Sequence, residues 1–127
     1  MKTRYTVALA MLAGAAIGGS VIQGLHAQAT PPTYFVADIS AVTDPEAVKA
    51  IGPKSGPAMA PFGGKYIVRT ENITPLTGTA PKRFVVIGFD SMDKANAWYK
   101  SAAQQEVENI RKQSTTSREF IVEGMTQ

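Results

Sequence analysis

The chain has 127 residues with no cysteine, and its 13 Lys and Arg residues slightly outnumber its 10 Asp and Glu residues. Two of the basic residues, Lys2 and Arg4, lie in a segment that we expect to be removed, so the remainder is close to neutral. Nucleic acid binding usually needs a clustered basic face, whereas basic and acidic residues are interleaved here. No nucleic acid partner is therefore predicted.

The first 29 residues have the pattern of a secretory signal peptide. The basic start MKTR precedes an uncharged run, and Ala27 and Ala29 then form the A-x-A pattern that signal peptidase reads. We predict cleavage after Ala29, a single domain over residues 30–127, and a periplasmic or secreted product with no membrane contact once the leader is removed. The alternative is an uncleaved N-terminal anchor, because the uncharged run is 21 residues long and could span a bilayer.

Loss of the leader would also remove His26, the only histidine in the chain. A chain without His and Cys cannot build a Ser-His-Asp triad, a thiol nucleophile or a zinc site based on those ligands. Any active site would use carboxylates, tyrosine, lysine, arginine or a bound cofactor. Neither a metal site nor a cofactor is predicted.

The first half of the remaining chain predicts a strand, an interrupted helix and a second strand. Residues 33–40 are rich in β-branched and aromatic side chains, as strands are. Asp44 and Pro45 are a good N-cap and first helical residue. The glycines and prolines at positions 52, 53, 56, 57 and 61 should then break this helix, leaving a second turn or two over 57–60. Gly63 and Gly64 permit a sharp turn into the strand over 63–70.

The second half predicts a loop, a strand, a long helix and a last strand. Residues 71–82 have turn-like composition, and residues 83–89 form a nearly continuous apolar run typical of a buried strand. Ser91 should cap a helix over 92–113 that bends near Ser101. Its expected inner face, at roughly helical spacing, consists of Met92, Ala95, Tyr99, Ala102, Glu106 and Ile110, and is widened by Ala103 and Val107. Arg111 is expected to complement the helix dipole near the C-terminal end, and residues 117–124 form the last strand.

The element order is therefore β-α-β-β-α-β, which indicates an α+β, ferredoxin-like fold with a four-stranded antiparallel sheet and its helices on one face. A sheet covered on one side normally alternates apolar and polar residues. Here both faces of residues 35–39 and 84–87 are apolar. We therefore expect a homodimer in which two sheets face each other across a cavity.

The chain resembles domain-of-unknown-function family 1330 over residues 34–124. The matching segments, in order, are YFVADI, TDPEA, FGGKYIVR, KRFVVIGFDSMDKANAWYKS, IRKQST and REFIVEG. The resemblance implies a small ferredoxin-like domain of the dimeric α/β-barrel superfamily, without an established activity. Two positions depart from the pattern: Gly88 stands where the family usually has glutamate, and Gln104 corresponds to a usual tyrosine. Any chemistry that depends on those side chains would be absent here.

Five residues are candidates for ligand binding: Asp38, Arg69, Arg83, Trp98 and Tyr99. Each also has a structural interpretation. The arginines either bind a carboxylate or cover apolar surface with their stems. Asp38 is either a desolvated proton acceptor or half of an ion pair. Trp98 and Tyr99 point about 100° apart on a helix; we expect Tyr99 in the core and Trp98 at a pocket rim.

Three hypotheses on function remain after these exclusions. The leading one is an exported, dimeric domain that binds a small apolar or weakly acidic molecule at the dimer interface. The second is a cofactor-independent oxygenase or isomerase that acts on a small ring compound, as some members of the superfamily do. The third is an interaction module of the cell envelope.

Overall fold

Four strands form one antiparallel sheet in the computed structural model, which describes residues 30–126. The strands are β1 (Thr33–Val42), β2 (Lys65–Thr70), β3 (Arg83–Phe89) and β4 (Thr115–Glu123), and their order across the sheet is β2-β3-β1-β4. The predicted leader and its cleavage after Ala29 lie outside the described residues. Within those residues, none of the helices is both long enough and apolar enough to cross a membrane.

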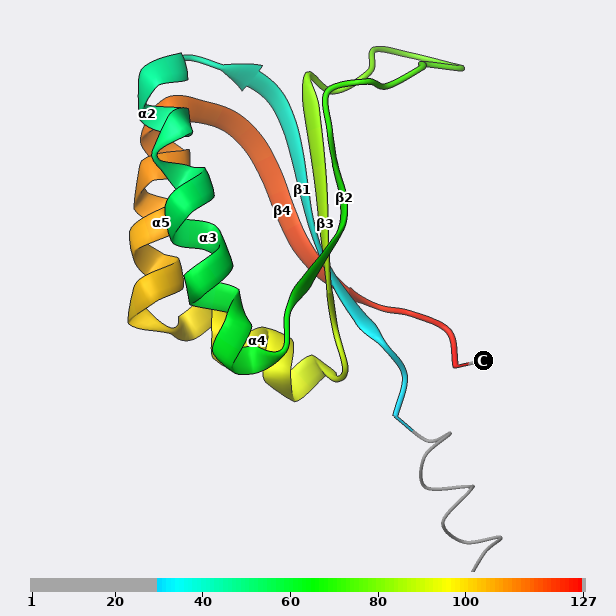
Figure 1. Ribbon diagram of the computed structural model, residues 1–127. Coiled ribbons are helices and arrows are strands. Elements are labelled where there is room, and N and C mark those ends of the chain that lie inside the picture. Colours follow the sequence, from blue (N-terminus) through cyan, green and yellow to red (C-terminus); the bar gives the residue numbers. More distant parts are fainter. Residues whose placement is uncertain (1–29, 127) are drawn as a thin grey trace, which may run out of the picture. The chain divides into compact units, whose positions relative to one another are not determined.

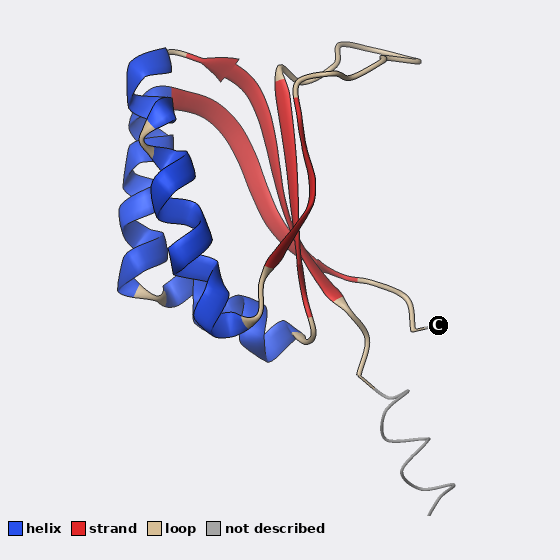
Figure 2. Cartoon of the chain, in the orientation of Figure 1, coloured by secondary structure: helices blue, strands red, loops and turns tan. Residues whose placement is uncertain are grey.

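The helices pack on one face of the sheet, as Figures 1 and 2 show. They are α2 (Pro45–Lys49), α3 (Ile51–Met59), the short 3₁₀ helix η1 (Ala60–Phe62), α4 (Met92–Lys100) and α5 (Ala102–Ser114). This element order and strand order confirm the predicted ferredoxin-like α+β fold. One end of β1 and β4 curves toward the helices, whereas β2 and β3 run straight past them into the 71–82 loop.

The first helical region is broken, but at a different place from the one predicted. The break is at Ala50. Helix α3 then runs through positions 52, 53, 56 and 57, which were expected to interrupt it, and ends before Pro61, so the expected place of the break was wrong. Pro53 lies in the first turn of α3, where an amide has no helical partner to lose. Pro57 lies inside the helix. The helix is held in place because its own residues Ser55, Ala58 and Met59 are buried against the rest of the domain.

The second helical region bends where predicted but buries a different face. Ser101 has an extended backbone and ends α4. Its hydroxyl accepts a hydrogen bond from the backbone amide of Gln104 and so caps α5. The break restarts the helical phase, so Ala102, Ala103 and Glu106 are exposed and the inner face expected there was wrong, whereas Val107 is buried as expected. The buried side chains of α5 are Gln104, Val107, Glu108, Arg111 and Ser114.

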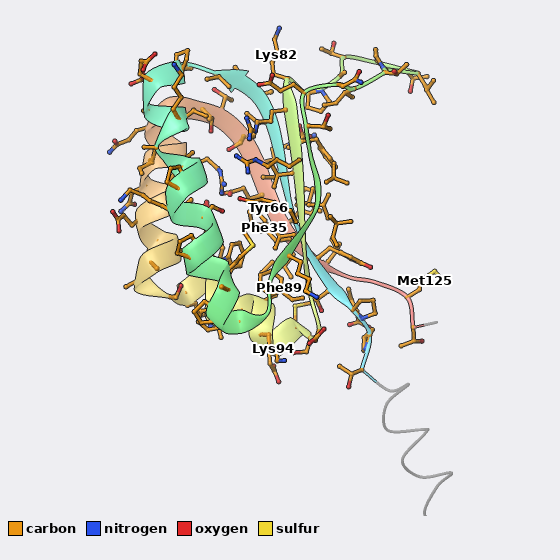
Figure 3. All side chains as sticks on the ribbon, in the orientation of Figure 1. Phe35, Tyr66, Lys82, Phe89, Lys94 and Met125 are labelled. Atoms are coloured by element: carbon orange, nitrogen blue, oxygen red, sulfur yellow. The ribbon has the colours of Figure 1, made fainter. Side chains whose placement is uncertain are left out.

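An aromatic cluster forms the centre of the core between helices and sheet. The centre of the Trp98 ring lies 4.9 Å from the centre of the Phe35 ring and 5.0 Å from that of Phe89, and Trp98 is fully buried. Figure 3 shows Phe35, Phe89 and Tyr66 in this interlayer space. Gly63, with φ of 72°, ends η1, and Gly64 then brings the chain close against Phe89. The two glycines thus provide the predicted turn into β2.

The other face of the sheet carries no helix and is rich in apolar side chains. Phe120 is 47% exposed and Val122 is 40% exposed on β4, and Ile67 is 59% exposed on β2. Alternation along the strands places Val36 and Val86 on the same face. We call this face, with these five residues, the open face.

Candidate functional site

A cavity of about 260 Å³ lies between the helices and the sheet, near the end where β2 and β3 lead into the 71–82 loop. Apolar side chains from both layers form much of its wall, namely Ile39, Val42, Val48, Ile51 and Val85. Three arginines and a lysine also line it: Arg69, Arg83, Arg111 and Lys49. The lining residues include no carboxylate. An apolar wall with converging cations is suited to an organic anion.

Arg69 reaches the cavity from β2 because its neighbours leave room for the side chain. Its guanidinium carbon lies 5.1 Å from the centre of the Tyr66 ring, and a cation over an aromatic face is attracted to it. A methyl group in place of the Gly52 hydrogen would lie 3.2 Å from Nη2 of Arg69, so the glycine permits this approach. Among the described residues no carboxylate forms an ion pair with Arg69.

Arg83 enters the same cavity from the start of β3. Its side chain is 25% exposed, and Nη1 lies 3.8 Å from Oε1 of Glu71, whose side chain is mostly in solvent. A long, exposed ion pair of this kind contributes little. Arg83 is therefore available to a ligand, and the structure brings together two arginines that the sequence singled out separately.

Arg111 lies in the last turn of α5, as predicted, but its side chain is buried and also forms contacts that the sequence did not indicate. Its Nη1 donates to Oε2 of Glu108 at 2.6 Å and to Oε2 of Glu119 at 2.8 Å. Gln104 donates through Nε2 to the same oxygen of Glu108 at 3.0 Å. We call these four residues the buried acid cluster. Arg111 alone connects it to the cavity wall.

The pKa of the Glu108 carboxyl lies well above its ordinary value. Burial raises this pKa to about 8, and the nearby Glu119 carboxyl adds to the effect, while the Arg111 guanidinium opposes it. Nearby Tyr99 also has a raised pKa, first because of burial and then because of repulsion by the two glutamates. A shifted carboxyl beside a cavity is a common feature of functional sites.

Asp38 belongs to the opposite side of the sheet and does not contact the cavity. It lies on β1 and accepts a 2.6 Å hydrogen bond from Nη2 of Arg118 on β4. Its side chain is 19% exposed. Of its two interpretations, the structure supports the ion pair.

Trp98 lies in the core, and Tyr99 packs against the edge of the same core. The assignment of Trp98 to a pocket rim was therefore wrong. Tyr99 is half-buried and lines a second hollow of about 220 Å³, together with Glu119 on β4. Both residues precede the break at Ser101, and the buried residues of α4 are Ala95 and Trp98, three positions apart on one helical face.

Glu108, Gln104 and Glu119 were missed as site residues in the sequence. A signal was present, because positions 104, 108 and 111 follow the i, i+4, i+7 spacing of one helical face. Gln104 was noted only as the replacement of a family tyrosine, and the structure places it against Glu108. Among the described residues, no group of side chains has an arrangement that would hold a metal ion.

The sheet topology and one-sided helix layer define a ferredoxin-like domain, and solved structures share this fold. A protein of unknown function from Rhodopseudomonas palustris, RPA0582, superposes with a TM-score of 0.63 at 16% identity, over 85% of this chain and 94% of that one. A dimeric ferredoxin-like protein of unknown function from Thermobifida fusca superposes with a TM-score of 0.56 at 15% identity, over 76% of this chain and 92% of that one. SnoaB, a cofactor-independent oxygenase from Streptomyces nogalater, superposes with a TM-score of 0.53 at 12% identity, over 73% of this chain and 92% of that one.

Residues 32–125 match the domain of unknown function DUF1330, so the chain belongs to that family. The resemblance noted in the sequence is thereby confirmed. No curated protein is significantly similar to the chain. At these low identities the solved structures show the fold alone.

Proposed function

We propose that this domain binds a small organic anion with an apolar body in the cavity between helices and sheet. The observation that carries the proposal is the convergence of Arg69, Arg83 and Arg111 on a cavity whose lining includes no carboxylate. A carboxylate or sulfonate would accept paired hydrogen bonds from a guanidinium, while a ring or short alkyl chain would contact Ile39 and Val85. The proposed site thus lies within one subunit and not between two sheets.

Calorimetric titration of the purified protein with naphthalene-2-sulfonate tests this proposal. The probe is a permanent anion with an apolar ring system, and 2-naphthol is its uncharged counterpart. We expect the sulfonate to bind at least about tenfold more tightly than the naphthol, because a charged hydrogen bond contributes roughly 1.5–3 kcal/mol.

The variant Arg69→Ala should weaken sulfonate binding by about tenfold through loss of the same interaction. Arg118→Ala is the matched control, since Arg118 is also a strand arginine but pairs with Asp38 on the open face. Equal affinity for the two probes, or equal losses in the two variants, would contradict the assignment of the site. Native mass spectrometry of protein purified without added ligand would then identify the natural occupant.

Homodimerisation is part of the proposed function. The support is the exposed apolar surface of Ile67, Phe120 and Val122, which a monomer would leave in water. A dimeric solved structure with the same fold is consistent with this arrangement. Pairing of two open faces would place the ligand cavities on the outer side of each sheet, under the helices.

Export of the domain is a further part of the proposal, and it rests on the leader pattern alone. We expect the protein recovered from the periplasm or medium to begin at Thr30. Intact-mass measurement distinguishes this product from a chain that retains residues 1–29. Recovery of the uncleaved chain in the membrane fraction would favour the anchored alternative.

A second candidate function is a cofactor-independent enzyme acting on a small ring compound. It is favoured by the hollow that contains Tyr99 and Glu119, beside the proton-holding Glu108. These groups could donate or accept a proton at a substrate. Screening of quinols and lactones for turnover, with Tyr99→Phe as the comparison, tests this function. Turnover that Tyr99→Phe leaves unchanged would exclude a role for this hollow.

A further inference from the structure

Arg111 faces the cavity and the buried acid cluster at the same time. It contributes to the cavity wall, yet its Nη1 is hydrogen-bonded to both Glu108 and Glu119. The side chain is only 4% exposed, and its Nε has no hydrogen-bond partner among the described residues. The cation that an anionic ligand would meet is therefore the same one that balances two acids behind the wall.

The charge of the cluster depends on one proton. With both glutamates ionised, the two carboxylates and one guanidinium carry a net charge of −1 in a buried place. With one proton bound, the cluster is neutral. Within residues 30–126, Arg111 is the only cation that forms an ion pair with either acid.

Among the described residues, the elements packed around Glu108 supply no other cation paired with it. Helix α4 contributes the Tyr99 hydroxyl, which is neutral, and β1 contributes the Phe35 ring, 5.9 Å from the Arg111 guanidinium carbon. Lys54 of α3 pairs instead with Glu106 on the exposed side of α5. Lys49 of α2 lines the cavity but pairs with Glu46.

We infer that the cavity binds its anionic ligand most tightly when the buried acid cluster carries a proton. The inference rests on the proposed ligand site. A ligand anion near Arg111 adds a negative charge next to two carboxylates, and repulsion is relieved when one of them is protonated. Coupling between two binding events is reciprocal, so the proton strengthens ligand binding by the same factor as the ligand strengthens proton binding.

The direction in which anion affinity changes with pH follows from the charge that the buried acid cluster carries at each pH. The raised pKa of Glu108, about 8, means that the cluster is neutral below that pH and negative above it. Arginine side chains stay charged throughout this range, and the raised pKa of Tyr99 keeps its hydroxyl neutral until more alkaline pH. Anion affinity should therefore be highest near pH 6.5 and should fall as the pH passes 8.

Titration with naphthalene-2-sulfonate between pH 6.5 and 9.5 tests the coupling, because the charge of this probe does not change in that range. We expect the dissociation constant of the wild-type protein to rise about fivefold or more across the interval, the lower end of typical coupling factors. Glu108→Gln, which is permanently neutral, should bind with nearly constant affinity. The matched control Glu106→Gln, on the exposed side of the same helix, should behave like the wild type.

A second measurement uses the wild-type protein alone and does not depend on how the variants fold. The carboxyl carbon resonances of the glutamates are followed by NMR during a pH titration, with and without saturating probe. A fivefold coupling corresponds to an upward shift of the Glu108 midpoint by about 0.7 pH unit. An unmoved midpoint, or the same pH dependence of affinity in Glu108→Gln and the wild type, would overturn this inference and leave the proposed ligand site standing. Absence of probe binding at every pH would overturn both.

Discussion

At the scale of single residues, the surroundings of Glu108 link the stability of the protein to pH. Its side chain is 1% exposed, and it shares its one cation with the partly buried Glu119. Two acids and one arginine do not form a balanced pair, and burial of an uncompensated charge is costly. The protein avoids that cost by keeping a proton on Glu108, so its stability depends on pH.

We predict that the free energy of unfolding falls between about pH 5 and pH 8. An unfolded glutamate ionises near pH 4.5, whereas the folded protein keeps its proton up to about pH 8. Within this window the folded state binds more protons, so rising pH favours unfolding by up to roughly 1 kcal/mol per pH unit, and the effect levels off above pH 8.

In the Glu108→Gln variant, the free energy of unfolding measured by urea denaturation should no longer fall across this pH range. Glu106→Gln should retain the decline, because Glu106 is exposed and pairs with Lys54 at the surface. The same slope in both variants would show that another group is responsible.

At the scale of the elements, the glycines of α3 and of the turn into β2 serve different purposes. A methyl group on Gly56 would meet no atom within 4 Å, whereas one on Gly64 would lie 2.9 Å from Cβ of Met59 and 2.8 Å from Phe89. Met59 and Phe89 are both core residues. Gly64 is thus required by packing, and Gly56 is not.

The two alanine substitutions should therefore have opposite effects on stability. Gly56→Ala should stabilise the protein by about 0.5–1 kcal/mol, because alanine is the better residue inside a helix. Gly64→Ala should destabilise it by roughly 1–3 kcal/mol through overpacking of the core. Thermal and urea denaturation measure both effects, and a stabilised Gly64→Ala would disprove the close packing described here.

At the scale of the whole molecule, the open face determines what the domain needs from its surroundings. Helices cover one side of the sheet, while Phe120 and Val122 on the other remain more than a third exposed. Apolar surface of this kind favours association. Because the cavity lies on the helix side, association through the open face would leave the proposed ligand site accessible.

Sedimentation velocity at micromolar concentration should show a dimer of the wild-type protein. Phe120→Glu should dissociate it, since an unpaired carboxylate would be buried against an apolar face. Lys112→Glu, on the exposed side of α5, is the control and should leave the dimer intact. A monomeric, well-folded wild-type protein would contradict the role assigned to the open face.

The sequence by itself determined the fold and the two-sided apolar character of the sheet. Apolar runs, turn residues and caps such as Asp44 and Ser91 act over a few neighbouring positions, so they can be interpreted without tertiary contacts. The sequence also identified Arg69 and Arg83 as candidate binding residues, but it did not indicate that both would line one cavity.

Only the tertiary structure decided which helical face is buried, where the cavity lies and which acid keeps its proton. The break at Ser101 restarts the phase of the helix, so Glu108 and Arg111 of α5 are buried, while packing against the sheet buries Trp98 of α4. The raised pKa of Glu108 comes first from burial under the fold and then from Glu119, which belongs to β4 and is brought close by packing against α5. Local sequence patterns carry no information on such contacts, because burial and charge pairing arise from residues distant along the chain.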